Sequence, residues 1–558
     1  IHPLSVDTYI EKTLAGAKAV LIRLIGGTPY WSYGLQQVEA LARSRGIVLA
    51  VLPGDGFEDA RLDAASTVPV TALRELAQWC DAGGARAAQA ALAALSQLAG
   101  LIDAPARTFD PLLMAGGWHP GRGVIDLEAF ARDPARPLVL IVFYRSYLTA
   151  HDLDPFAALH TAFEQRGFDA LSIFVPSLKA PQVREQVDRW VRGLGPAAII
   201  NATAFSARGD DGATPLDGAG VPVFQLALAT SGRAGWAAAS RGLSPADLAM
   251  HVVLPEIDGR VFAGVASFKE AGTRDPALGF ARTIHRADAG RVGAITARVA
   301  GWIALAQTPV AERRVALVLS TYPGKTYQMA HAVGLDALAS AEAILADLAE
   351  AGYATDAQAG LAALLQCTHQ HWPMAEYRKA LAALPDTLRA ELFAAWGEPE
   401  ADAAAADGAF RFAALPIGNA LVALQPERGE RAHRDGDYHD LSRCPRHGYV
   451  AFYLWLRQRS VDALVHIGAH GTLEWLPGKS VALSDACWPE ALTGAMPVIY
   501  PFIVNDPGEA AQAKRRISAV TIGHVPPPLV QTQSGAGLAR IEALLDEFSN
   551  AGGLDLAR

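Results

Sequence analysis

The stretch from Leu138 to Phe143 reads Leu-Val-Leu-Ile-Val-Phe, and it decides the fold class. A continuous apolar run of this length is typical of a strand buried on both faces of a parallel sheet. It is followed by a predicted amphipathic helix over Pro155–Arg166 and a predicted strand over Leu171–Val175. A helix near Gln182–Arg192 and a strand over Ala197–Asn201 continue the alternation. Strands that alternate with helices of this length predict a parallel sheet covered by helices on both faces.

Two other segments of the chain also begin with a predicted strand that is followed by a helix. The predicted strand Ala19–Ile25 is followed by a helix near Tyr33–Arg45 and a strand over Ile47–Leu52. The predicted strand Val315–Leu319 is followed by a helix over Asp336–Glu350. The sequence therefore predicts an α/β fold made of several doubly wound, Rossmann-like parallel-sheet units.

Length and composition suggest how these units are divided. A chain of 558 residues is too long for one hydrophobic core. Linker-like segments lie at Ala129–Pro137 and Gln307–Glu312. We expect an N-terminal α/β domain over residues 1–134, a second over 135–308 and a third over 309–440. Residues 441–558 form the remaining segment.

Charge and cysteine usage argue against several classes of protein. The 48 Lys and Arg residues against 57 Asp and Glu give a net charge of −9, which argues against general nucleic-acid binding. The four cysteines form no CxxC pair, which is typical of a reducing compartment, so we expect a cytoplasmic protein. Apolar runs are of strand length, and no membrane span is predicted because a span needs about 20 apolar residues.

The densest group of functional side chains lies at residues 466–479, which read His-Ile-Gly-Ala-His-Gly-Thr-Leu-Glu-Trp-Leu-Pro-Gly-Lys. This stretch follows Val461–Val465, which is predicted to be a short buried strand. In an open α/β sheet, ligands bind at the carboxyl ends of the strands. We therefore expect the chemistry of the protein to lie here.

Imidazole and carboxylate ligands suit Co, Ni, Fe or Zn better than Mg or Ca. His466, His470 and Glu474 are therefore predicted to form a metal site. If the chain is helical from Gly471 onward, His470 and Glu474 share one helix face. Apolar neighbours of Glu474 would raise the pKa of its carboxyl group and suit it to accept a proton. The alternative is that each histidine is only a hydrogen-bonded interior side chain.

A basic segment, Lys514–Arg516, follows a predicted helix start at Asp506–Glu509. Arginine is well shaped to bind carboxylates, so the segment is a candidate clamp for an acidic ligand. The alternative is a solvated helix end.

Two Gly-Lys-Ser/Thr segments resemble phosphate-binding loops without matching them. A P-loop needs a further glycine five residues before the glycine of Gly-Lys. Those positions are Leu319, before Gly324-Lys325-Thr326, and Leu473, before Gly478-Lys479-Ser480. We therefore expect that this chain does not itself hydrolyse ATP.

The stretch 466–479 resembles the signature of the cobaltochelatase large subunit, the CobN family, which is related to the large subunit of magnesium chelatase. Further matching segments occur in the expected order along almost the whole chain: Arg23–Gly27, Leu52–Asp55, Phe143–Ser146, Leu254–Arg260 and Pro501–Glu509. The chain departs from the family pattern at Cys444, where a proline is expected, and over Gly324–Met329. Members of the family are much longer than this chain, so the resemblance implies that residues 441–558 begin an active-site region that continues beyond Arg558.

The resemblance implies an enzyme that inserts Co2+ into a corrin, hydrogenobyrinic acid a,c-diamide, in cobalamin biosynthesis. It implies that ATP and Mg2+ are used by separate AAA+ ATPase partner subunits. Glu474 and His470 would be catalytic, and His466, His470 and Glu474 would deliver the metal. The residues predicted to bind the substrate are Lys479, Trp475, His439, His447, Arg145, Asn505, Arg515 and Arg516.

Three other functions remain open at this point. The nearest is magnesium insertion into protoporphyrin IX by the related large subunit. A non-catalytic tetrapyrrole or metal carrier is the second. A metal-dependent hydrolase is the third, although the chain has no matching hydrolase motif.

Overall fold

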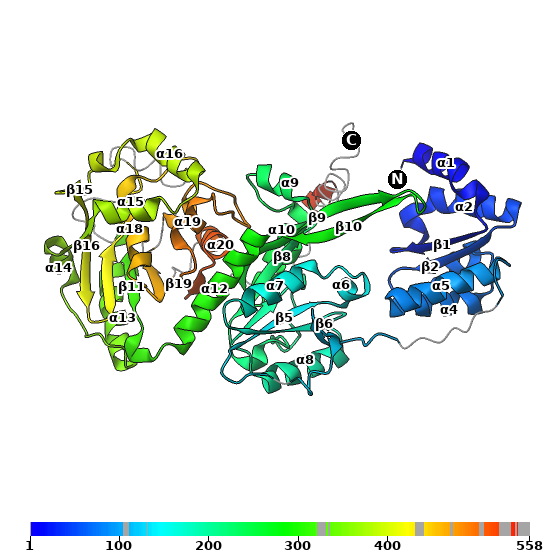
Figure 1. The fold of residues 1–558 in the computed structure, drawn as a ribbon, viewed down its shortest axis with the longest axis horizontal. Helices are drawn as coiled ribbons and strands as arrows, with labels where there is room; N and C mark the ends of the chain where they lie inside the picture. The colour runs from blue at the N-terminus through cyan, green and yellow to red at the C-terminus, as the bar shows by residue number, and fades with distance from the viewer. Residues whose placement is uncertain are drawn as a thin grey trace.

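The computed structural model describes residues 2–103, 111–130, 132–320, 331–332, 335–429, 440–468, 472–501 and 507–523, and a few residues between 537 and 544. Figure 1 shows α/β units following one another along the long axis of the molecule. The predicted α/β class, with several sheets that contain parallel strands, is confirmed. Within the described residues, no helix has both the length and the apolar character needed to cross a bilayer.

The N-terminal unit is built on two parallel strands, β1 (Ala19–Leu24) and β2 (Val48–Pro53), joined by helix α2 (Ser32–Arg45). Successive side chains of a strand point to opposite faces. Leu49 and Val51 therefore pack in the same core cluster as residues of α2, whereas Ala50 and Leu52 pack in a second cluster. That second cluster includes residues of α4 (Val70–Ala82) and α5 (Ala85–Leu98).

The second sheet has the strand order β10-β9-β8-β7-β5-β6-β3-β4. Its parallel centre consists of β5 (Leu138–Tyr144), β6 (Asp169–Val175), β7 (Ala198–Asn201), β8 (Val223–Ala229) and β9 (Val261–Asp275). Its antiparallel edges, which the sequence did not predict, are β3 (Gly116–His119), β4 (Gly123–Ile125) and β10 (Phe280–Ala287).

Helices cover both faces of the second sheet. Alternate residues of β5 pack in one cluster with α7 (Asp154–Glu164) and α12 (Ala289–Gln307), and the others pack in a second cluster with α8 (Pro181–Leu194). The β9–β10 hairpin extends from the sheet towards the N-terminal unit, and α12 runs towards the third sheet (Figure 1).

The third sheet has the strand order β14-β16-β17-β11-β18-β19-β20. Its strands are β14 (His369–Pro373), β16 (Ala409–Ile417), β17 (Ala420–Leu424), β11 (Val315–Leu319), β18 (Ala463–Ile467), β19 (Val498–Pro501) and β20 (Val520–Ile522). Neighbouring strands from β17 to β20 are parallel, whereas β14 and β16 are antiparallel to their neighbours. The sheet continues across residue 440, because β18 pairs with β11; the predicted domain boundaries stay predictions.

The remaining elements connect or cover the sheets. The helices are α1 (Pro3–Lys12), α3 (Ala60–Ala65), α6 (Arg145–Thr149), α9 (Arg233–Ala238), α10 (Pro245–Leu248), α11 (Leu254–Glu256), α13 (Ala337–Glu350), α14 (Leu361–Cys367), α15 (Met374–Leu381), α16 (Asp386–Trp396), α18 (His447–Gln458), α19 (Trp488–Thr493) and α20 (Pro507–Arg516). The short strands are β12 (His331–Ala332), β13 (Leu335–Asp336) and β15 (Ala405–Ala406).

Two local predictions near the lead motif need correction. The strand predicted over 461–465 runs from Ala463 to Ile467, so that His466 lies within it instead of after it. The helix considered from Gly471 onward is, within the described residues, a single 3-10 turn over Leu473–Trp475. The helix start predicted at Asp506–Glu509 is confirmed, since α20 begins at Pro507.

Candidate functional site

Polar side chains meet at the carboxyl ends of neighbouring parallel strands of the third sheet. Gln425 directly follows β17, His466 is the last residue but one of β18, and Tyr500 lies near the end of β19. The carboxyl ends of parallel strands share one edge of the sheet, which is where ligands bind in this class of fold. Together with Glu474 from the following loop, these residues are called the third-sheet site below.

His466 is completely buried in this site. Its Nε2 lies 3.2 Å from Nε2 of Gln425, and its ring centre lies 4.9 Å from that of Tyr500. Burial lowers the pKa of His466 to about 4, so the imidazole is neutral at pH 7. Nδ1 has no hydrogen-bond partner among the described residues. A neutral imidazole with an unengaged nitrogen suits a metal ligand.

The amide of Gln425 joins His466 to two tyrosines of α18. Its Nε2 lies 2.6 Å from the hydroxyl of Tyr453 and 3.1 Å from that of Tyr449. The Tyr449 hydroxyl in turn lies 2.7 Å from Oγ1 of Thr472, at the start of the loop that carries Glu474. These contacts fix the imidazole and the loop relative to the same helix.

Glu474 is the buried carboxyl group of the site. The Tyr500 hydroxyl donates to its Oε1 at 3.3 Å, and its Oε2 has no hydrogen-bond partner among the described residues. Burial raises the pKa of Glu474 to about 7, and the nearby charge of Glu509 acts in the same direction. Such a group can accept or release a proton near neutral pH.

A close approach between two loops shapes this edge of the sheet. A Cβ atom on Gly468 would lie 2.4 Å from Cβ of Ser320, the residue that follows β11. Only glycine fits at this distance, so the glycine directly after β18 lets the chain pass against the neighbouring strand end.

Arg516 holds the loop from the other side. Its buried guanidinium donates to the backbone carbonyl of Glu474, to that of Leu476 at 2.7 Å and to that of Lys479 at 3.0 Å. Trp475 also contacts α20, because its Nε1 donates to Oε2 of Glu509 at 2.6 Å. The predicted clamp residue Arg516 thus positions the Glu474 loop.

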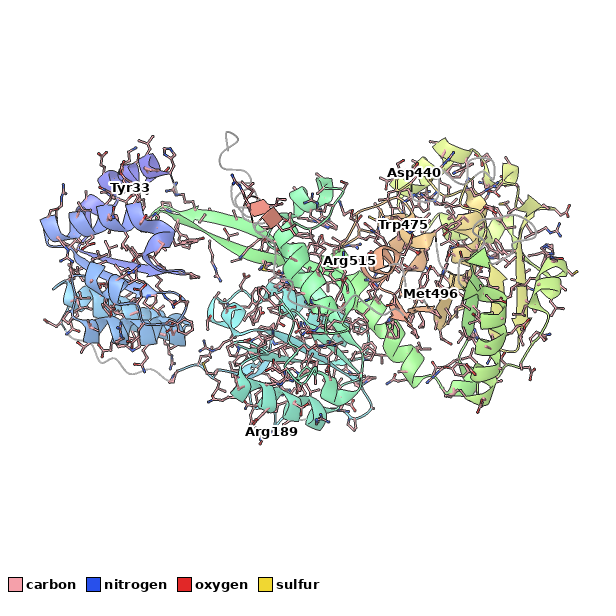
Figure 2. All side chains as sticks on the ribbon, turned by 180° about the vertical axis from the view of Figure 1, so that it is seen from behind. Tyr33, Arg189, Asp440, Trp475, Met496 and Arg515 are labelled. Atoms are coloured by element: carbon pink, nitrogen blue, oxygen red, sulfur yellow. The ribbon has the colours of Figure 1, made fainter. Side chains whose placement is uncertain are left out.

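Lys479 and Arg515 join the third sheet to the second unit. The Lys479 ammonium donates to the carbonyls of Ala237 and Ala239 at 2.9 and 2.7 Å. Arg515 forms a bidentate ion pair with Glu256, with both bonds at 2.8 Å. Figure 2 shows Trp475 and Arg515 in the region where the two units meet. Binding of substrate carboxylates by these cations stays a prediction.

The other predicted substrate residues have partners elsewhere in the chain or lie outside the described residues. Arg145 is buried and donates to the backbone carbonyls of Leu112 and Leu113 at 3.0 and 2.8 Å. His447 begins α18, with Nδ1 2.6 Å from the Tyr377 hydroxyl and Nε2 3.0 Å from the carbonyl of Gly397. The predictions for His439, His470 and Asn505 fall outside the described residues.

Sequence reasoning missed Gln425, Tyr449 and Tyr453. Gln425 carried a usable signal, since it is the first polar residue after the apolar run of β17. Tyr449 and Tyr453 are four residues apart and share a helix face, but α18 is so apolar that they resemble ordinary core residues.

A parallel-sheet edge with a buried imidazole and a buried carboxyl group of raised pKa defines this as an α/β protein with a candidate metal and proton-transfer site. Comparison with protein families matches residues 77–558 to the family described as CobN/Magnesium Chelatase. The chain belongs to this family, as the resemblance of its motifs implied.

Individual relatives agree with this assignment. The chain is 38% identical to "Aerobic cobaltochelatase subunit CobN" of Sinorhizobium sp, over 100% of this chain and 46% of the relative. It is 39% identical to the protein of the same name from Pseudomonas aeruginosa, over 99% of this chain and 46% of the relative. The solved structure described as "Catalytic Subunit of Cobaltochelatase from Mycobacterium tuberculosis" matches with a TM-score of 0.71 and 31% identity, over 100% of this chain and 48% of that one. The chain thus spans about half the length of these relatives.

Proposed function

We propose that this chain is part of the large subunit of a cobaltochelatase, which inserts Co2+ into a corrin, hydrogenobyrinic acid a,c-diamide. In this proposal ATP and Mg2+ are used by separate AAA+ partner subunits. The relatives from Sinorhizobium sp and Pseudomonas aeruginosa, at 38% and 39% identity, are both named cobaltochelatase subunits, which supports cobalt as the metal. The structural observation that carries the proposal is the buried carboxyl group of Glu474, with one oxygen unpartnered among the described residues, at the strand edge beside a neutral His466.

Metal insertion requires that Co2+ loses water ligands and that the pyrrole nitrogens lose protons. In the proposal, His466, His470 and Glu474 replace water around the ion one ligand at a time, as their nitrogen and carboxylate donors allow. The unengaged Nδ1 of His466 supports this role. Glu474 then accepts a ring proton through Oε2, the oxygen that Tyr500 does not contact.

The surroundings of Glu474 support its role as proton acceptor. The Tyr500 hydroxyl donates to Oε1 and favours the ionised form, whereas burial favours the neutral form. Burial, together with the charge of Glu509, outweighs the hydrogen bonds that favour the ionised form, so the carboxyl group has a pKa of about 7, where proton transfer in both directions is accessible. Arg516 keeps this side chain in place through the backbone carbonyl of Glu474 itself.

The cations predicted to bind the corrin carboxylates have partners within the chain. Arg515 would have to leave Glu256, and Lys479 would have to leave two backbone carbonyls, before either paired with substrate. The proposal therefore assigns Arg516 first to holding the loop that carries Glu474, and Lys479 and Arg515 first to joining the third sheet to the second unit. Trp475 remains the candidate for flat contact with the macrocycle.

The experiment that tests the proposal is an insertion assay with the full-length protein and its partner subunits. Co2+ with the corrin is compared with Mg2+ and protoporphyrin IX, following the product by its absorption spectrum. The proposal predicts metallated product only from Co2+ and the corrin, and only with ATP. Product from Mg2+ and the porphyrin alone would favour the second candidate, magnesium chelatase, to whose subunit ChlH of Oryza sativa the chain is 27% identical. Corrin binding without any product would favour a non-catalytic carrier.

A further inference from the structure

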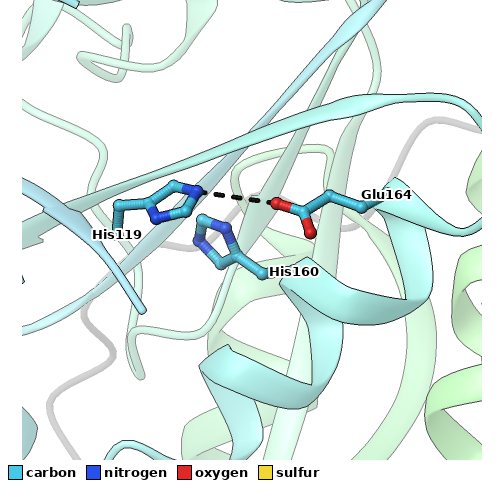
Figure 3. Close-up of side chains that lie close together, drawn as sticks. All are labelled: His119, His160 and Glu164. Carbon is cyan, nitrogen blue, oxygen red and sulfur yellow. Dashed lines mark ion pairs between the residues drawn. The ribbon is translucent and has the colours of Figure 1, made fainter. Parts of the chain in front are cut away.

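A second group of histidine and carboxylate side chains lies on the second sheet, far along the chain from the third-sheet site. His119 ends β3, and His160 and Glu164 are four residues apart on α7. One potential ligand atom from each lies within 4.8 Å of the others, and Figure 3 shows the three side chains pointing toward one another. His119, His160 and Glu164 are called the second-sheet site below. Nothing in the proposed function uses it.

His160 is held as a metal-binding histidine would be. Its side chain is completely buried, with Nε2 2.8 Å from Oγ of Ser172 on β6, and its Nδ1 has no partner among the described residues. A hydrogen bond from one ring nitrogen to a neighbouring oxygen is the usual device that orients a ligating histidine and leaves the other nitrogen free. The Trp118 ring packs edge-on against the imidazole at 5.7 Å and fixes its plane.

His119 and Glu164 form the open side of the site. Nε2 of His119 lies 3.5 Å from Oε1 of Glu164, and their side chains are 21% and 45% exposed. The backbone N–H of Gly121 donates to Nδ1 of His119, which turns Nε2 toward Glu164. Solvent access to these two residues gives an ion a route to the buried nitrogen of His160.

From this geometry we propose that His119, His160 and Glu164 bind a divalent transition-metal ion of the Co2+ or Zn2+ class. Two imidazoles and one carboxylate suit such ions and leave further coordination positions for water. Ligand atoms around a tetrahedral ion with bonds of about 2.1 Å are roughly 3.4 Å apart, close to the observed His119–Glu164 separation. The exposed Glu164 side chain can move to complete the site. Binding through Nε2 requires the neutral His119 ring to carry its proton on Nδ1, which ends the exposed contact from the Gly121 N–H.

The purely structural alternative is that His119 and Glu164 form a solvent-exposed ion pair beside the buried side chain of His160. That alternative leaves the buried Nδ1 of His160 without a partner among the described residues, and an unsatisfied buried polar atom is unfavourable. A bound ion removes this cost, because the nitrogen then has a ligand. It also explains why the polar ring is buried with one nitrogen anchored and the other directed at two groups that can ligate metal.

Equilibrium dialysis of the intact chain against Co2+, and separately against Zn2+, tests the site. His119→Ala and Glu164→Gln are expected to bind one ion fewer per chain than the unmodified protein, or to bind that ion at least roughly tenfold more weakly. Both side chains are partly exposed, so these variants are expected to fold. The matched controls are Glu185→Gln, on the exposed face of α8, and His371→Ala, on the exposed part of β14; both should bind as the unmodified protein does.

A second readout distinguishes a metal site from a purely structural role. Paramagnetic Co2+ bound beside Trp118 should quench part of the tryptophan fluorescence, whereas Zn2+ should not, and this part should be lost in His119→Ala. Glu474→Gln should keep the part of the quenching that depends on His119. Equal numbers of ions bound with equal affinity by His119→Ala, Glu164→Gln and the unmodified protein would overturn the proposal.

Discussion

The second-sheet and third-sheet sites combine the same kinds of side chain in opposite surroundings. In the third-sheet site both His466 and Glu474 are fully buried, and tyrosines and a glutamine surround them. In the second-sheet site only His160 is fully buried, while Glu164 is 45% exposed. Burial shifts the carboxyl group of Glu474 into the range of proton transfer, whereas Glu164 keeps ready access to solvent ions. Under the two proposals, the buried carboxyl group accepts a proton during metal insertion, whereas the exposed one completes a site that binds an ion from solvent.

The largest change in stability is expected from Arg516→Ala. The substitution leaves three backbone carbonyls of the Glu474 loop without their donor, which should cost at least about 3 kcal/mol at about 1 kcal/mol for each bond. Hydrogen exchange of the Ser480 and Val481 amides, which bond to the second unit, measures the loss of local protection. Lys514→Ala, on the same helix, is the control. Equal protection in both variants would contradict the positioning role of Arg516.

The next largest effect is expected in the pH dependence of stability, which tests the burial of Glu474 in the third-sheet site. Glu474 has a pKa of about 7 in the folded chain against 4.5 in a free side chain, so folding favours its neutral form. Its cost to stability is absent below pH 4.5, develops as the pH rises, and is complete above about pH 7, where it reaches about 3 kcal/mol. In metal-free protein, Glu474→Gln should therefore become more stable than the unmodified chain as the pH rises through this window. Thermal unfolding at several pH values measures this. A stability difference between Glu474→Gln and the unmodified chain that stays the same from pH 4.5 to 7 would contradict this account of the buried carboxyl group.

A smaller effect is expected from Ser172→Ala, which removes the oxygen that orients His160. The change is nearly isosteric, so the chain should fold, but metal affinity at the second-sheet site should fall by about 10- to 100-fold. Titration with Co2+ measures the affinity, followed by the part of the tryptophan fluorescence quenching that is lost in His119→Ala. Ser172 lies on β6 and not in the third-sheet site. Unchanged Co2+ affinity in Ser172→Ala would mean that the hydrogen bond from Ser172 does not prepare the His160 ring to bind metal.

Much of the fold was predictable because buried strands are continuous apolar runs. Val315–Leu319 was predicted with the bounds that β11 has, and the strands at 138–143 and 197–201 were within one residue. The antiparallel edges were missed: β3 contains glycines and a histidine instead of an apolar run, and polar residues interrupt the apolar residues of β10. Their pairing depends on contacts between distant segments.

The candidate sites likewise depend on contacts between distant segments, which the sequence does not predict. His466 and Glu474 were found because one short segment carries both, although the end of β18 lies two residues later than predicted. Gln425, Tyr449 and Tyr453 come from other strands and helices, and only the parallel order of the sheet brings them to His466. In the second-sheet site, His160 and Glu164 share a predictable helix face, but His119 joins them only because β3 pairs with β6.

The most direct test of the central claim is cobalt insertion by Glu474→Gln in the full-length protein with its partner subunits. Glutamine keeps the size and hydrogen-bonding capacity of the side chain but cannot accept the ring proton. Corrin binding should survive, whereas the rate of insertion should fall by about 100-fold or more, the usual contribution of a general base. Glu185→Gln serves as the matched control and should insert cobalt at the unmodified rate. Insertion by Glu474→Gln at the unmodified rate would contradict the account.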